Sequence, residues 1–105
     1  MVAVQFDVFA NPHPESARLH PYVVVLQHDA LSAFNTRLVA PLISPTAAPS
    51  FGRLMPEVSV EGSRYVVDVT NIGVMPAHLL QERVANLEDR RYDIVEAIDL
   101  VFNGV

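Results

Sequence analysis

The sequence predicts an α+β or mainly β fold, in which an antiparallel sheet or small barrel is followed by one C-terminal helix. Residues 2–9 and 57–69 carry strand and hairpin patterns, whereas the apolar residues become helically spaced from residue 87 onward. No helical segment alternates with the strand segments, and a parallel sheet needs such crossovers. The length of 105 residues favours a single domain spanning residues 1–105.

The first expected strand covers residues 2–9, because apolar residues recur there at every second position. Its buried face would hold Val2, Val4, Phe6 and Val8. Residues 11–16 follow, with two prolines within three positions. Since proline has no amide hydrogen for a sheet ladder, this stretch predicts a surface loop.

Two further strands are expected at residues 22–28 and 38–43, which are rich in β-branched and other apolar residues. Pro41 lies inside the second of these segments, and a proline in a strand indicates an edge strand or a bulge. Residues 44–52 read SPTAAPSFG, a composition that predicts a loop.

The clearest hairpin pairs residues 57–60 with residues 64–69. The intervening Glu61-Gly62-Ser63 contains a glycine, which accepts the positive φ angle of a tight hairpin turn. Residues 76–80 suit helix as well as strand, and we expect them to be extended.

The C-terminal segment has the apolar stripe of an amphipathic helix. The members of this stripe are Leu87, Ile94, Ile98, Val101, Phe102 and Val105. Asn86 is the expected N-cap, and Gly104 lies where the helix is expected to end. The charged residues between 82 and 96 predict a solvated helix face rather than paired catalytic carboxylates. Glu88 and Arg91 have the spacing of an ion pair on that face.

Composition excludes several classes of function. The formal charge of −5 and the pI of about 5.1 give no basic surface of the kind that binds nucleic-acid phosphates. Without cysteine there is no disulfide, thiol nucleophile or cysteine-ligated zinc. The N-terminus has no basic targeting region, and the longest apolar run is far shorter than the roughly 20 residues that a membrane-spanning helix needs. We expect a cytoplasmic protein that oligomerises to extend its small core.

Motifs for catalysis or cofactor binding are missing as well. The four histidines, at positions 13, 20, 28 and 78, form neither an HExxH motif nor a pair spaced four residues apart. No serine lies in a GxSxG motif, and the four glycines are too dispersed to cradle a phosphate. We therefore expect no catalytic residue, no metal site and no cofactor, and a binding protein is the natural interpretation.

The segment from Ala85 to Val105 resembles the C-terminus of the CcdB toxin family, where the similar pattern runs VADLxxxxxDIxxAINLMFWGI. Upstream, residues 4–9 are similar to the N-terminal strand of that family, and residues 37–42 are similar to its R-M-V-I-P-L segment. The match spans most of the chain. Its specific part is the tail, because a helix that ends abruptly in an aromatic-rich tetrapeptide at the last residue is unusual.

The resemblance implies a homodimeric toxin of a plasmid- or chromosome-borne toxin–antitoxin pair, with an SH3-like barrel and a terminal helix. In the CcdB family the target is DNA gyrase. The last residues of both toxin protomers enter the interface between the two gyrase A subunits and hold the enzyme with its DNA cut. A CcdA antitoxin wraps the toxin and releases the enzyme. The toxin itself catalyses nothing.

Carried over by position, the resemblance implies a gyrase-binding site made of Asp99, Phe102, Asn103, Gly104 and Val105. Phe102, Gly104 and Val105 match the terminal F-x-G-I of the family. Asn103 stands where the family has a tryptophan that stacks on a gyrase arginine, and Asp99 stands where the family has an asparagine. Periodicity alone instead favours Phe102 and Val105 as core residues of the helix end or of a dimer.

Two alternatives remain open at this point. The first is a CcdB-fold homologue that keeps dimerisation and antitoxin binding but has lost or changed its target, because Asn103 and Asp99 depart from the family pattern. The second is an endoribonuclease like the MazF/Kid toxins, which share this architecture. Thr36 and Arg37 are the one pair that would suit such catalysis, and the acidic charge of the chain disfavours it.

Overall fold

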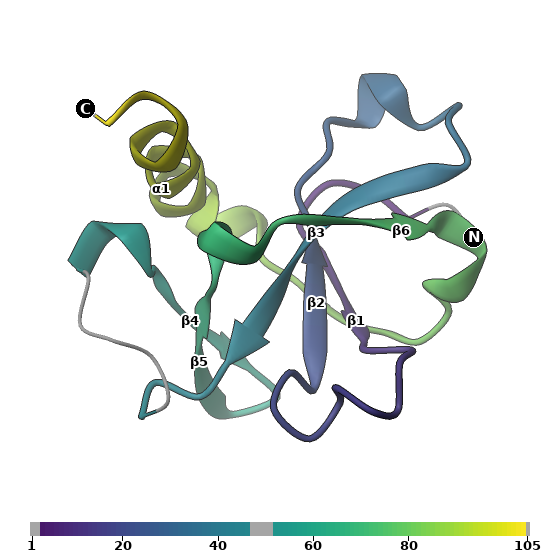
Figure 1. The fold of residues 1–105 in the computed structure, drawn as a ribbon, viewed down its shortest axis with the longest axis horizontal. Coiled ribbons are helices and arrows are strands. Elements are labelled where there is room, and N and C mark those ends of the chain that lie inside the picture. Colours follow the sequence, from purple (N-terminus) through teal and green to yellow (C-terminus); the bar gives the residue numbers. More distant parts are fainter. Residues whose placement is uncertain (1–2, 47–51, 105) are drawn as a thin grey trace.

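The structure, a computed structural model, describes residues 3–46 and 52–104. In these residues seven antiparallel strands form one sheet in the order β4-β5-β3-β2-β1-β7, and β6 pairs with β3. The strands are β1 (Asp7–Ala10), β2 (Tyr22–Val25), β3 (Thr36–Ile43), β4 (Glu57–Val60), β5 (Ser63–Val67), β6 (Gly73–Pro76) and β7 (Arg83–Asn86). Helix α1 (Arg91–Asn103) follows them (Figure 1).

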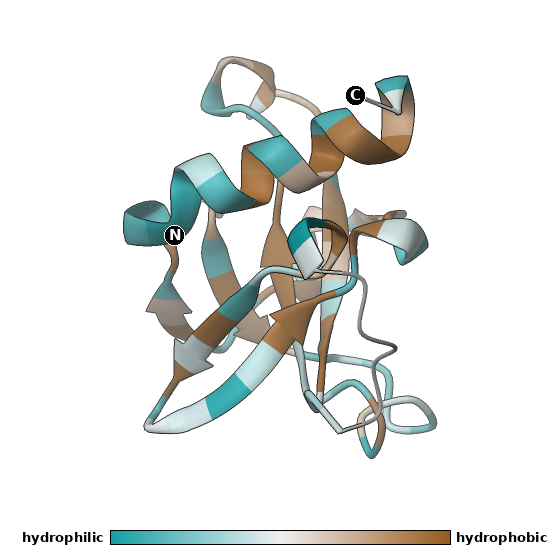
Figure 2. Cartoon of the chain, turned by 90° about the vertical axis from the view of Figure 1, so that its left-hand side faces the viewer, coloured by the Kyte–Doolittle hydropathy of each residue, from teal (hydrophilic) through white to brown (hydrophobic). Residues whose placement is uncertain are grey.

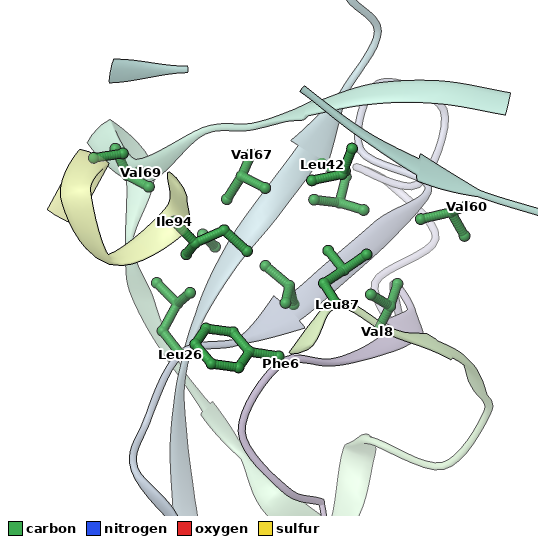
Figure 3. Packing of buried hydrophobic residues seen from close by; sticks show 13 residues of the cluster. Phe6, Val8, Leu26, Leu42, Val60, Val67, Val69, Leu87 and Ile94 are labelled. Atoms are coloured by element: carbon green, nitrogen blue, oxygen red, sulfur yellow. The ribbon is translucent and has the colours of Figure 1, made fainter. Parts of the chain in front are cut away.

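The sheet curls into a nearly closed barrel, so the expected fold, an SH3-like small barrel with a C-terminal helix, is confirmed. The main core lies between the strands and α1. Figure 3 shows Phe6, Leu42 and Ile94 inside it, and each of these side chains is fully buried. None of the helices in residues 3–46 and 52–104 combines the length and the hydropathy that a membrane span requires.

The first strand is shorter than expected. It begins at Asp7, and residues 3–6 form a turn instead of continuing the strand; Val2 lies outside the described residues. The Asp7 amide donates to the Val4 carbonyl, and the Val4 amide donates to the Asp7 carboxylate, both at 3.0 Å. Phe6 takes a φ of 69° in this turn and enters the core. The alternation of apolar residues does not predict this turn, because the turn is closed by hydrogen bonds between Val4 and the buried Asp7.

Pro41 does not mark an edge, which corrects the expectation from the sequence. Strand β3 is central and pairs with β2, β5 and β6. Pro41 is opposite Val23, and its carbonyl accepts from the Asp68 amide at 2.9 Å on the side away from β2. On that side β6 pairs with Thr36–Val39 and β5 pairs with Leu42 and Ile43. The missing amide of Pro41 therefore falls between two partner strands and interrupts no ladder.

The loop over residues 11–16 is confirmed, whereas the second strand ends at Val25 rather than at residue 28. Of the loop predicted over residues 44–52, residues 47–51 lie outside the described residues. Residues 76–80 are not extended throughout, because Ala77–Leu79 form a 3-10 turn. Strands β6 and β7 had no expected counterpart, since their short sequences, GVMP and RVAN, do not alternate clearly.

The β4–β5 hairpin is confirmed, but its second strand covers Ser63–Val67 rather than residues 64–69, and Val69 begins a 3-10 turn. The hairpin closes with a two-residue turn, since Val60 is opposite Ser63. Glu61 and Gly62 have φ values of 50° and 80°. Two consecutive positive φ angles are the requirement of a type I′ turn, whose twist matches that of the flanking strands.

We expect Gly62→Val to destabilise the protein by about 1 to 3 kcal/mol, because a β-branched residue is strained at positive φ. The measurement is urea unfolding followed by circular dichroism. Glu61→Gly is the matched control, and it should have a small effect because glycine adopts positive φ without strain. Equal losses of stability in the two variants would contradict the turn geometry.

Candidate interaction surface at the end of the helix

The start of α1 is fixed by side chains from the chain just before it and from the N-terminal turn. Asn86, the expected N-cap, is instead the last residue of β7: Leu87 is the N-cap of the 3-10 turn Glu88–Arg90 and Arg90 is that of α1, neither with a capping side-chain hydrogen bond. Asn86 Oδ1 still accepts from the Glu88 amide at 2.8 Å. Arg91 Nε donates to the Glu88 carboxylate at 2.7 Å, which confirms that ion pair, and the Arg91 guanidinium lies 5.0 Å from the centre of the Phe6 ring. The hydrogen bond with Glu88 raises the pKa of Arg91.

The inner face of α1 differs from the expected stripe. Ile94 and Ala97 are fully buried, and Ile98 packs against them as a partly buried residue. Val101, by contrast, is 38% exposed and Phe102 is 72% exposed. The stripe therefore enters the core over its first two turns only. Figure 2 shows α1 lying across one end of the barrel, with its hydrophobic residues concentrated toward the C-terminal half.

Gly104 ends α1 as expected. Its φ is 71°, a left-handed conformation that favours glycine, and its amide donates to the Leu100 carbonyl at 2.9 Å. Asp99, Phe102, Asn103 and Gly104 are all exposed, and we call them the helix-end surface. Val105, the fifth residue of the expected site, lies outside the described residues.

Sequence reasoning missed two residues that extend this surface along the helix. Tyr92 is 87% exposed and Val95 is 37% exposed. With Asp99 and Phe102 they follow spacings of three, four and three residues, so they share one side of α1. This spacing is readable in the sequence. It was overlooked because the stripe through Ile98 and Phe102 was assigned to the inside.

A second group of exposed apolar side chains lies on the sheet. Leu38 and Val74 are directly opposite each other on β3 and β6, and they are 42% and 66% exposed. Leu38 is two residues from the buried Ala40 of the main core, so this pair continues the face of the sheet that α1 covers. We call Leu38 and Val74 the β3–β6 patch.

Thr36 and Arg37 do not converge on a common site. They are neighbours in β3 and point to opposite faces; Thr36 is exposed and Arg37 is buried. The Arg37 guanidinium donates to the carbonyl oxygens of Ala3, Ser32, Phe34 and Thr36, at 2.6 to 3.4 Å. Because these hydrogen bonds occupy its nitrogens and hold the loop before β3, Arg37 has a structural role here.

Titratable side chains do not gather into a metal site within the described residues: no group of three or more His, Cys, Asp or Glu lies together. His28 accepts from the Ala30 amide through Nδ1 at 3.0 Å. The buried carboxylate of Asp7 accepts from Asn86 Nδ2 at 3.0 Å and lies 3.6 Å from Arg83 Nη1. The contacts of Asp7 with Asn86 and Arg83 join the N-terminal turn to β7, so Asp7 stabilises the fold.

Comparison with known proteins points to one family. The family model described as CcdB protein matches residues 5–104. The Mycobacterium tuberculosis toxin MazF-mt6 has a similar structure, with a TM-score of 0.65 and 18% identity over 78% of this chain and 85% of that one. The MazE-MazF structure from Deinococcus radiodurans gives a TM-score of 0.72 and 14% identity, and covers 98% of this chain and 97% of that one. At these identities the two structures show a shared fold.

Proposed function

The chain belongs to the CcdB family, and on that premise we propose that it is the toxin of a toxin–antitoxin pair and binds the DNA gyrase A subunit through its helix-end surface. The bound toxin would trap gyrase with its DNA cleaved, and a CcdA-like antitoxin would neutralise it. The toxin acts by binding, so it makes and breaks no bond itself.

The observation that carries this proposal is the exposure of the end of α1. A buried tail could not enter another protein. Phe102 is 72% exposed and lies in the part of α1 that follows the buried residues Ile94 and Ala97. Burying a phenylalanine side chain in a partner contributes about 1.5 to 3 kcal/mol. Asp99, one turn earlier on the same side, adds a negative charge that suits a cationic residue of the target.

We also propose that the protein is a homodimer joined through the β3–β6 patch. Leu38 and Val74 extend the core face of the sheet past α1, and a second copy would bury them. A dimer presents two helix ends. Two linked contacts with a pair of gyrase A subunits would raise the overall affinity well above that of one tail.

A homologue with an altered target is the second candidate function, and the observation that favours it is Asn103. The residue is exposed at the tip of the helix, where the family has tryptophan, and its amide side chain has no aromatic face to stack on a cation. In that case the dimer and the antitoxin contact would persist without gyrase binding.

We expect Phe102→Ala to weaken binding to the purified gyrase A subunit by roughly 30-fold, which corresponds to about 2 kcal/mol. Surface plasmon resonance with this gyrase subunit immobilised measures the affinity. Leu19→Ala is the matched control, because Leu19 is 74% exposed in the loop before β2 and lies outside the helix-end surface. Both variants should unfold within about 0.5 kcal/mol of the wild type.

The proposal fails if the wild-type protein neither binds the gyrase A subunit nor induces gyrase-linked DNA cleavage when expressed in bacteria. Equal binding by the Phe102→Ala and wild-type proteins would place the contact elsewhere on the molecule.

A further inference from the structure

The barrel has a seam between its first and last strands in the sheet order. β4 and β7 are the two ends of the strand path among the described residues, and no ladder joins them. A surface pocket of about 360 Å³ lies along this seam. Its lining comes from β4 (Glu57, Val58, Ser59), from β5 (Arg64) and from the segment where β7 leads into α1 (Asn86, Leu87, Asp89, Arg90).

The register of the hairpin shows which backbone groups of β4 face the seam. Val60 and Ser63 flank the two-residue turn, and the Val67 amide donates to the Pro56 carbonyl at 2.9 Å. Since hydrogen-bonded pairs alternate along an antiparallel ladder, Val58 bonds to β5 while Glu57 and Ser59 direct their amide and carbonyl groups the other way. The edge of β4 thus presents Glu57 and Ser59 to the pocket.

Arg90 occupies part of this edge. Its Nη2 donates to the Glu57 carbonyl at 2.9 Å, in the place where the amide of an added strand would donate. The same nitrogen is 2.9 Å from the Asp93 carboxylate. Among the described residues, however, no hydrogen-bond partner contacts the buried Arg90 Nε. The Arg90 side chain is 41% exposed, so solvent can replace its hydrogen bond to Glu57 when it is displaced from the edge of β4.

We propose that the seam edge of β4 takes an extended segment of the antitoxin as an added strand. The segment would pair with the backbone of Ser59 and replace Arg90 at the Glu57 carbonyl. Addition of a strand to an exposed sheet edge is a general mode of peptide recognition, in which backbone hydrogen bonds supply affinity. Arg90, once displaced, keeps Asp93 as one partner and has further guanidinium N–H groups to offer, so the segment carries an acidic side chain next to its pairing residues.

This inference rests on the proposed antitoxin partner but uses a surface separate from the helix-end surface. The edge of β4 is short, with four residues, and Glu57 and Arg64 form an ion pair beside it at 3.0 Å. Charges and short length protect such an edge from non-specific pairing. The site therefore favours one complementary segment over aggregation.

The test is Ser59→Pro, which removes the amide that faces the seam and leaves the bonds between β4 and β5 in place. Proline is tolerated on an edge strand when its missing amide would face solvent. The probe is the product of the gene adjacent to the toxin gene, co-expressed and purified with this protein. Ser59→Pro is expected to weaken the complex at least 10-fold by calorimetry. Ser59→Thr is the matched control, because it keeps the amide and is expected to bind like the wild type.

Amide hydrogen exchange of the wild-type protein is a second measurement that does not depend on how well a variant folds. The Ser59 amide should exchange at least 10-fold more slowly in the complex than in the free toxin. Equal affinities of the Ser59→Pro and wild-type proteins, with unchanged exchange at Ser59, would overturn the added strand and leave the proposed toxin function intact. Failure of the wild-type protein to form any complex would overturn the antitoxin partner and this inference together, whereas gyrase binding is measured separately.

Discussion

Replacing Asn103 by tryptophan is expected to raise the affinity for the gyrase A subunit by about 30-fold to 1,000-fold. The residue is exposed at the tip of α1, next to Phe102, so the larger ring extends into the partner without disturbing the core. A tryptophan at the centre of an interface contributes about 2 to 4 kcal/mol, and each 1.4 kcal/mol is a factor of ten. Tryptophan is also the best aromatic partner for a cation. Surface plasmon resonance and a gyrase cleavage assay measure the change.

Asn103→Leu is the control for this substitution, because it adds apolar area without an aromatic face. It should raise the affinity by a much smaller factor. If Asn103→Trp binds the gyrase A subunit no more tightly than the wild type and is not toxic, residue 103 does not stack on a gyrase arginine as the family tryptophan does. If Asn103→Trp binds the gyrase A subunit and the wild type does not, the wild-type protein is a homologue with an altered target.

Shortening Ile94 to alanine should have the largest effect on stability, about 2 to 5 kcal/mol of the free energy of unfolding. The side chain is fully buried between α1 and the sheet, where Figure 3 shows it facing Leu26 and Phe6. Alanine is the better helix former, but that gain is below about 0.7 kcal/mol and does not offset the cavity. A loss of this size is a large part of the roughly 5 to 15 kcal/mol that stabilises a typical domain. Thermal and urea unfolding measure it.

Val95→Ala is the matched control for Ile94→Ala, since it shortens a neighbouring side chain that is 37% exposed. Its effect on unfolding should stay below about 1 kcal/mol. If the two substitutions destabilise the protein equally, α1 does not pack on the sheet through the face that carries Ile94 and Ala97.

The order of most elements could be predicted from the sequence because the segments concerned are locally consistent. In the hairpin around Gly62, the strand pattern and the turn chemistry agree. At the end of α1, Gly104 adopts the left-handed conformation that the sequence indicates. Strand β6, by contrast, contains a glycine and a proline and forms through its pairing with β3, a partner that lies far away in the sequence.

The candidate site was only partly predictable. Asp99, Phe102, Asn103 and Gly104 were assigned to it by the resemblance to the family, while periodicity placed Phe102 inside. The structure leaves them exposed because only the earlier part of the helix packs on the core: Ile94 and Ala97 are fully buried, whereas Val101 and Phe102 are exposed. The sequence shows the spacing that joins Tyr92 to Phe102, but only the packing of α1 decides which side of the helix faces outward.

By itself, the sequence determined the acidic, cysteine-free composition, the hairpin turn and the C-terminal helix with its glycine stop, since each depends on residues close together in the chain. Tertiary structure alone decided that Pro41 lies in a central strand, that Arg37 reaches the carbonyl oxygen of Ala3, and that β4 and β7 leave a seam. These features depend on how distant segments meet. Local propensity cannot specify that meeting, because burial and long-range pairing supply the free energy that selects it.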